Sequence, residues 1–142
     1  MKVLTAREAS MFACLTDTVV APAPYLPAVS DTDAAAAFDD WLARAPRANA
    51  IAMRAMVVAA ELAPLATGHR HRLRRLPPPR RKAFLHTLEH SKAPPLRQLT
   101  KAIKSMAYLC YYGDDGILNR LGYDPDANVR RGRELRKAQG RP

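Results

Sequence analysis

The chain has 142 residues, of which 48% are hydrophobic, and a formal net charge of +10. This length fits one domain with its own core, and no apolar run approaches the roughly 20 residues that cross a bilayer, so we expect no transmembrane helix. No useful length of sequence alternates between apolar and polar residues. We therefore predict an all-α protein, a compact bundle of about five to six short helices.

The positive charge is concentrated in the second half of the chain. Residues 1–67 hold five Lys or Arg and seven Asp or Glu, a net charge of −2, whereas residues 68–142 hold eighteen and six, a net charge of +12. This asymmetry favours an anionic partner: nucleic acid, a membrane surface or the acidic face of a protein. The N-terminus lacks the apolar segment of a secretory signal, and the two cysteines lack CxxC spacing. We expect a cytoplasmic protein with free, buried thiols.

The first helix is predicted by a capping box. Thr5 and Glu8 have the spacing at which each side chain accepts a hydrogen bond from the other residue's backbone N–H, so a helix should follow and run to about Val20. Its buried ridge is expected to be Phe12, Leu15 and Val19. Three prolines then predict an extended connector that reaches Ser30, because proline disfavours helix in the residue before it.

Two further helices should follow the connector. A short one is expected to start at Asp31 or Thr32 and end at Ala45, with Phe38 and Trp41 as its anchors. The next should run from about Arg47 to Ala66 and stop at Gly68, with Pro64 kinking or shortening its last turn. It is the most apolar helix and is expected to form the core through a ridge at helical spacing: Ile51, Ala55, Val58, Leu62 and Leu65.

A basic, proline-rich loop spans residues 69–82. It is either a solvated linker or a phosphate-binding segment, and no aromatic residues interleave with its arginines to stack bases. A short helix should then cover residues 80–91. There His86, Glu89 and His90 match the HxxEH string of inverted zinc peptidases. A zinc site also needs a third ligand on another helix, so two surface histidines are the favoured interpretation.

The principal helix is predicted from Pro94 to Tyr112, since proline suits the first helical turn. One face carries apolar residues at intervals of three and four, namely Leu96, Leu99, Ile103, Met106 and Cys110, and is widened by Ala102 and Leu109. The opposite face carries basic residues toward the N-terminal end of the helix and tyrosines toward its C-terminal end. It is either an ordinary solvated face or a docking surface, because tyrosine and arginine are enriched at the centres of interfaces.

The C-terminal part of the chain is predicted to turn twice. Gly113 is expected in the left-handed conformation and Asp115 as the cap of a short helix with Ile117, Leu118 and Leu121. We therefore expect a single helical domain over residues 1–128. Residues 129–142 should form a basic, partly extended tail that is either disordered alone or ordered by a partner.

No catalytic apparatus is recognisable in the sequence. It contains no glycine-rich phosphate loop, no CxxCH haem attachment and no GxSxG nucleophile elbow, so we expect a binding protein with no catalytic, cofactor-binding or metal-binding residues of its own. The tyrosines concentrate at the end of the principal helix, which favours a protein partner there. The expected partner-binding residues are Arg97, Lys101, Lys104, Tyr108, Tyr111, Tyr112, Tyr123, Arg130 and Arg131.

Several short strings together resemble a known family. The matching elements are Leu4 and Thr5 with Glu8, Leu76 and Pro77 with Arg80 and Arg81, Phe84 and Leu85, Leu88 and Glu89, residues 111–114 (YYGD) and residues 121–125 (LGYDP). They resemble the small, third subunit of gluconate 2-dehydrogenase-type flavoproteins of the glucose-methanol-choline group, and the helical N-terminal extension of long-chain alcohol oxidases.

The resemblance implies a noncatalytic accessory subunit that binds and stabilises a large FAD-dependent subunit, which oxidises an alcohol, sugar or sterol. FAD is then expected on the partner chain, and the pair forms a hetero-oligomer. The chain lacks the twin-arginine signal often found in the gluconate-type subunit, which favours a cytoplasmic complex. The alternative is a basic helical module that binds nucleic acid or regulates another protein.

Overall fold

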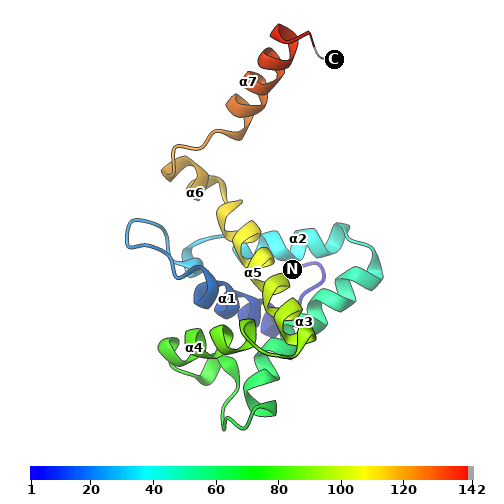
Figure 1. The fold of residues 1–142 in the computed structure, drawn as a ribbon, viewed down its shortest axis with the longest axis vertical. Helices are drawn as coiled ribbons and strands as arrows, with labels where there is room; N and C mark the ends of the chain where they lie inside the picture. Colours follow the sequence, from blue (N-terminus) through cyan, green and yellow to red (C-terminus); the bar gives the residue numbers. More distant parts are fainter. Residues whose placement is uncertain (141–142) are drawn as a thin grey trace.

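The computed structural model describes residues 1–140, and the predicted all-α fold is confirmed there. These residues form seven α-helices, two 3-10 turns and no strand. The 3-10 turns cover Val29–Asp31 (η1) and Leu73–Arg75 (η2). The helices are α1 (Ala6–Val20), α2 (Ala34–Arg44), α3 (Arg47–Ala66), α4 (Pro78–Glu89), α5 (Pro94–Tyr112), α6 (Asp115–Arg120) and α7 (Pro125–Ala138). Helices α1 to α5 form the body, and α6 and α7 extend away from it (Figure 1).

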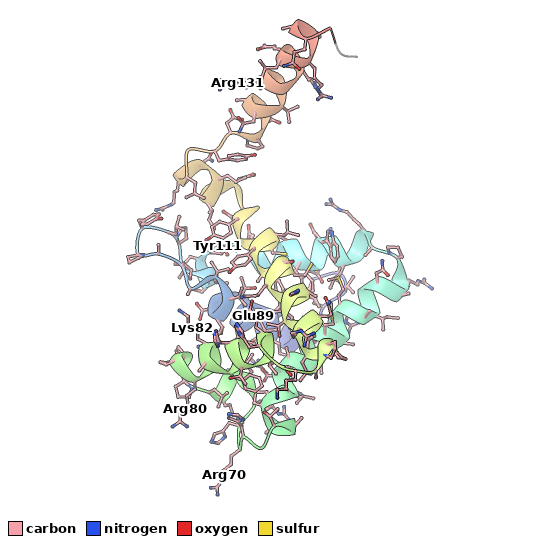
Figure 2. All side chains as sticks on the ribbon, in the orientation of Figure 1. Arg70, Arg80, Lys82, Glu89, Tyr111 and Arg131 are labelled. Atoms are coloured by element: carbon pink, nitrogen blue, oxygen red, sulfur yellow. The ribbon has the colours of Figure 1, made fainter. Side chains whose placement is uncertain are left out.

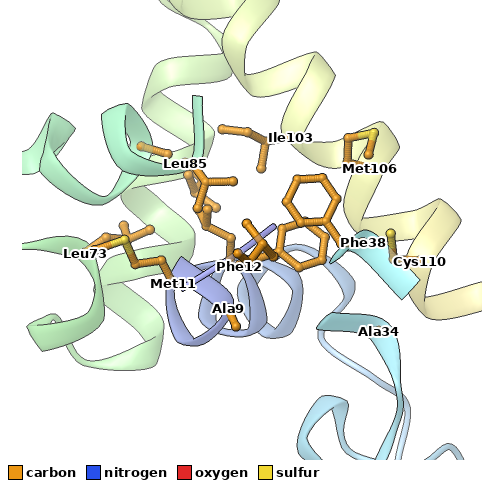
Figure 3. Packing of buried hydrophobic residues seen from close by; sticks show 14 of the residues in the cluster. Ala9, Met11, Phe12, Ala34, Phe38, Leu73, Leu85, Ile103, Met106 and Cys110 are labelled. Carbon is orange, nitrogen blue, oxygen red and sulfur yellow. The ribbon is translucent and has the colours of Figure 1, made fainter. Parts of the chain in front are cut away.

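Helix α1 lies at the centre of the body and packs against α2, α3, α4 and α5. The predicted capping box begins it: the Glu8 N–H donates to the Thr5 hydroxyl at 3.2 Å, and the Thr5 N–H donates to the Glu8 carboxylate at 2.8 Å. Phe12 from α1 stacks on Phe38 from α2 with ring centroids 4.0 Å apart (Figure 3). This stack joins the first two helices to the Ile103 and Met106 side of α5.

Helix α3 has the predicted bounds, but the prediction of its buried ridge is wrong. The buried residues of α3 are Ala50, Val57, Ala60, Glu61 and Pro64, whereas the expected ridge is exposed except for Val58, which is half-buried against the core. Both sides of the helix are apolar, so periodicity alone could not choose between them. By length and composition α3 is also, among residues 1–140, the one helix long and apolar enough to cross a membrane.

Several element ends differ from the prediction for local reasons. Helix α2 starts at Ala34, because η1 occupies the residues before it, and its expected anchor Trp41 is half exposed. Helix α4 starts at Pro78 instead of Arg80, since prolines fit the first helical turn. The expected extended tail is helical from Pro125, where Asp124 caps α7 by accepting the Ala127 N–H at 2.9 Å.

Two carboxylates are buried in the body, and neither was predicted. Asp39 on α2 accepts the backbone N–H groups of the first residues of the chain, Lys2, Val3 and Leu4. Glu61 on α3 accepts the backbone N–H of Arg74 at 3.2 Å and its guanidinium Nε–H at 3.1 Å. Because a buried carboxylate needs such donors, these two residues fix the N-terminus and the η2 turn onto the body.

Replacing Ala21 by glycine is expected to stabilise the protein. Ala21 ends α1 in the left-handed conformation with φ 43°, the only non-glycine residue among residues 1–140 with positive φ. The steric cost of that conformation, about 1–2 kcal/mol, exceeds the entropy that glycine adds to the unfolded chain. Thermal unfolding followed by circular dichroism should show a melting temperature about 2–4 °C higher. Ala93→Gly, at an exposed extended position, is the control and should lower it.

Candidate docking site at the end of helix α5

The predicted apolar face of α5 is confirmed at its centre. Thr100, Ile103, Met106, Ala107, Cys110 and Tyr111 are buried, and Leu96 and Leu99 are half-buried against the core. Two prolines in the first turn start the helix without breaking a hydrogen bond. The packing of this face against α1, α2 and α4 fixes which residues of α5 point outward.

The three basic residues expected to bind a partner have different surroundings. Arg97 is half-buried and donates to the Ser91 carbonyl at 2.8 Å, so it closes the α4–α5 turn. Lys104 Nζ lies 2.7 Å and 2.8 Å from the carboxylate oxygens of Glu89 on α4. That hydrogen bond lowers the pKa of Glu89. Lys101 is exposed and makes no ion pair within residues 1–140, so it is the basic residue of α5 that is free to meet an anionic surface.

Tyr108 and Tyr112 form the aromatic end of the outer face. Both side chains are more than one third exposed, and their rings lie near parallel with centroids 6.1 Å apart. Tyr108 also lines a pocket of about 240 Å³ between α1, α4 and α5, beside Lys104 and His86. The two rings thus offer a rigid apolar surface with hydroxyl groups, which suits a protein contact.

Tyr111 belongs to the core, which corrects its expected place in the partner-binding set. Its side chain is fully buried, and its hydroxyl donates to the Pro27 carbonyl at 2.6 Å. It packs with Val29 of η1 and Ile117 of α6. Burial, followed by the nearby Tyr112 and Asp114, raises the pKa of the Tyr111 phenol. Tyr111 therefore holds the proline-rich connector and α6 onto α5 and cannot touch a partner in this fold.

Two leucines of α5 and α6 are exposed, and for Leu109 this corrects the prediction that it widens the apolar face. Leu109 is 69% exposed on α5, and Leu121 at the end of α6 is 46% exposed. Tyr123 in the following turn is about half exposed. We call the α5–α6 surface the set Tyr108, Leu109, Tyr112, Leu121 and Tyr123. The sequence did not predict the exposure of Leu109, because its spacing also fits the buried face.

The turn between α5 and α6 is built differently from the prediction. Asp114, not Asp115, caps α6: its carboxylate accepts the Ile117 N–H at 3.1 Å. Gly113 has φ −83°, so it is not left-handed. A Cβ there would lie 2.6 Å from the Leu109 carbonyl oxygen, and this lack of room explains the glycine. The turn orders α6 beside the end of α5 and so fixes the position of Leu121.

Helix α7 has no buried residue. Arg131 lies exposed on this helix (Figure 2). Arg130 is exposed too, and its guanidinium lies 3.9 Å from the Asp124 carboxylate. A helix of 14 residues is marginal in water without tertiary packing. The expected domain boundary between residues 128 and 129 falls inside this helix, and residues 141 and 142 lie outside the described residues.

The two cysteines and the His86–His90 pair show few features of a catalytic or metal-binding site. Burial raises the pKa of the Cys110 thiol to about 11, so this thiol is protonated at neutral pH. Both cysteines are free, and Cys14 is half-buried. The rings of His86 and His90 are tilted by 31° to each other, with centroids 4.3 Å apart. Within residues 1–140, no group of three or more His, Cys, Asp or Glu side chains has the arrangement of a metal site.

Comparison with protein-family models, with curated proteins and with solved structures finds no match to this chain. The family resemblance of its short strings therefore stays a prediction.

Proposed function

We propose that this chain is a noncatalytic accessory subunit that docks on a larger oxidoreductase subunit through the α5–α6 surface and α7. The proposed partner carries FAD and oxidises an alcohol, sugar or sterol, as the family resemblance implies. The partner would order α7 and complement its arginines with acidic groups. Catalysis and flavin binding would then belong to the partner chain alone.

The observation that carries the proposal is the exposure of large apolar side chains on consecutive elements at one end of the body. The five side chains of the α5–α6 surface are 37–69% exposed, and α7, which follows directly, has no buried residue. Clustered exposed apolar side chains mark interaction sites, whereas scattered ones are ordinary. Arg130 and Arg131 beside them favour a partner with acidic groups.

Affinity purification of the full chain at moderate salt tests the proposal. A large polypeptide with the absorption spectrum of flavin should copurify in a defined ratio. Replacing both Tyr112 and Tyr123 by alanine should weaken its affinity by about 2–4 kcal/mol, because exposed tyrosines at an interface centre are frequent hot spots. Isothermal titration with the purified partner measures this loss.

The matched control is Trp41→Ala, which removes a half-exposed aromatic side chain from α2. It should leave the affinity unchanged while the far-ultraviolet circular dichroism of both variants stays that of the natural chain. A monomeric protein that binds DNA or RNA in a salt-sensitive way, with no flavoprotein in the complex, would overturn the proposal in favour of the nucleic-acid alternative.

A further inference from the structure

The outer face of α3 is an apolar surface on the opposite side of this helix from the core. Ile51 is 64% exposed, and Leu62 and Leu65 are 40% and 41% exposed. Leu62 and Leu65 lie 11 and 14 residues after Ile51, which places all three on one side of an α-helix. Exposed Ala55 and Ala59 lie between them, and half-buried Val58 joins this face to the core against which it packs. A surface helix normally presents polar residues there, so this face is arranged for an apolar contact.

One ion pair lies beside the N-terminal half of this face. Arg54 belongs to it, and its Nε donates to the Glu8 carboxylate at 3.0 Å. A second guanidinium nitrogen of Arg54 lies 2.9 Å from the same carboxylate. The hydrogen bond from Arg54 is the main cause that lowers the pKa of Glu8, against desolvation by burial. The hollow beside this pair, lined by Ile51, Ala55 and Val58, has a volume of about 390 Å³ and is almost entirely apolar.

The C-terminal end of the face opens into a basin lined by arginines. The basin has a volume of about 600 Å³, and Leu65 lies in its wall. Its one acidic residue, Glu61, is buried and already paired with Arg74 at 3.1 Å. Four further arginines line the basin, and none has an ion pair within residues 1–140: Arg7, Arg70, Arg72 and Arg75.

We propose that the outer face of α3 and the arginine basin bind the surface of an anionic membrane. Leu65 belongs to both the apolar face and the basin, so the two form one continuous surface. A helix that lies in a bilayer interface buries apolar side chains at the boundary of the acyl chains and meets lipid phosphates with arginine or lysine. The face of α3 supplies the apolar side chains. The guanidinium groups of the basin supply the contacts to lipid phosphates, since their geometry matches that of phosphate.

A second copy of this chain fits the same surface poorly. Each acidic group on it, Glu8 and Glu61, already has an arginine partner. In a two-fold dimer through α3, the free arginines of one copy would therefore face no free carboxylate on the other. Anionic lipid supplies the missing negative charge, and it accepts the apolar side chains as well.

Vesicle flotation of the full chain at physiological ionic strength tests the proposal. The vesicles contain either phosphatidylcholine alone or equal parts of phosphatidylcholine and phosphatidylserine. The protein should float with the anionic vesicles and remain behind with the neutral ones. Each arginine near an anionic surface strengthens binding about fivefold, so Arg70→Gln, Arg72→Gln and Arg75→Gln together should lower the partition coefficient about a hundredfold.

Two further variants separate the proposed surface from net charge. Arg130→Gln, Arg131→Gln and Arg133→Gln remove the same charge from α7, at the other end of the molecule from Arg70 (Figure 2), and should lower partitioning no more than a few fold. Ile51→Gln, Leu62→Gln and Leu65→Gln keep the charge and should lower it tenfold or more, since they remove the apolar insertion.

Three results would overturn the proposal. One is absence of binding to anionic vesicles at physiological ionic strength. Another is an equal loss from the α7 variant and the basin variant, which would show unspecific charge attraction. The third is release of the protein from vesicles by millimolar pyrophosphate at constant ionic strength, which would assign the basin to a soluble phosphate. Size-exclusion chromatography of the α3 variant, unchanged in elution from the natural chain, shows that loss of binding is not loss of the fold.

Discussion

Replacing Tyr111 by alanine should destabilise the protein by about 3–5 kcal/mol, the range found when a fully buried aromatic side chain is truncated. The change empties the contact between α5, η1 and α6 and leaves the Pro27 carbonyl without its 2.6 Å hydrogen bond. Urea unfolding followed by circular dichroism measures the loss of free energy of unfolding. Limited proteolysis should also show faster cleavage of the connector between α1 and η1.

The adjacent residue supplies the control for this prediction. Tyr112 is 37% exposed and contacts Tyr111 edge to face, with ring centroids 5.1 Å apart. Tyr112→Ala should therefore cost about 1 kcal/mol or less. Equal destabilisation by the two variants would contradict the assignment of Tyr111 to the core and Tyr112 to the surface. Tyr111→Phe keeps the ring and removes only the hydrogen bond, so it should fall between them.

The positions of the helices were largely predictable from the sequence because their ends carry local signals. The capping box at Thr5, the prolines before α5 and Gly68 after α3 each act within one helical turn. Helix α7 carries such a signal too, since Asp124 followed by Pro125 is a good start. Few of its residues are apolar, so the hydrophobic pattern that indicates the other helices is weak there.

The faces of the helices were less predictable, because burial depends on partners far away in the sequence. In α3 both sides are apolar, and the placement of α1, α2, α5 and η2 decides that Val57 and Ala60 are buried while Ile51 is exposed. Tyr111 and Tyr112 are neighbours in the sequence, yet Tyr111 is buried because the connector, 84 residues earlier, supplies its hydrogen-bond acceptor. Helical periodicity in the sequence does not indicate such a distant contact.

The two proposed surfaces use different kinds of exposed apolar groups. The α5–α6 surface has tyrosines with polar tips next to arginines on a separate helix, which suits a protein contact with specific hydrogen bonds. The outer face of α3 has aliphatic side chains without hydrogen-bonding groups, next to a basin of arginines. Because they lie on different elements, one chain could hold a protein partner and a membrane surface together. Loss of one interaction through mutation should then leave the other intact.

Replacing Asp39 by alanine should destabilise the protein by about 3 kcal/mol. The Asp39 carboxylate is buried, and its oxygens accept the N–H groups of Val3 at 3.0 Å and Leu4 at 2.6 Å, together with that of Lys2. Alanine leaves buried donors unpaired, which costs about 1–3 kcal/mol for each group that water cannot reach. Asp40→Ala is the matched control. Asp40 lies on the surface, 2.9 Å from Lys2 Nζ, and its loss should cost about 0.5 kcal/mol.

The contribution of Asp39 should also depend on pH. Burial raises the pKa of its carboxyl, but the three backbone N–H donors outweigh burial, and the net effect lowers it below the ordinary 3.8. A carboxylate whose pKa is lower in the folded state stabilises the fold above the unfolded pKa, and this contribution disappears as the pH falls through the folded pKa. The difference in free energy of unfolding between the natural chain and Asp39→Asn should therefore be full at pH values above about 5 and shrink toward pH 2. Urea unfolding across this range measures it, and a difference that stays constant down to pH 2 would show that the charge of Asp39 does not hold the N-terminus.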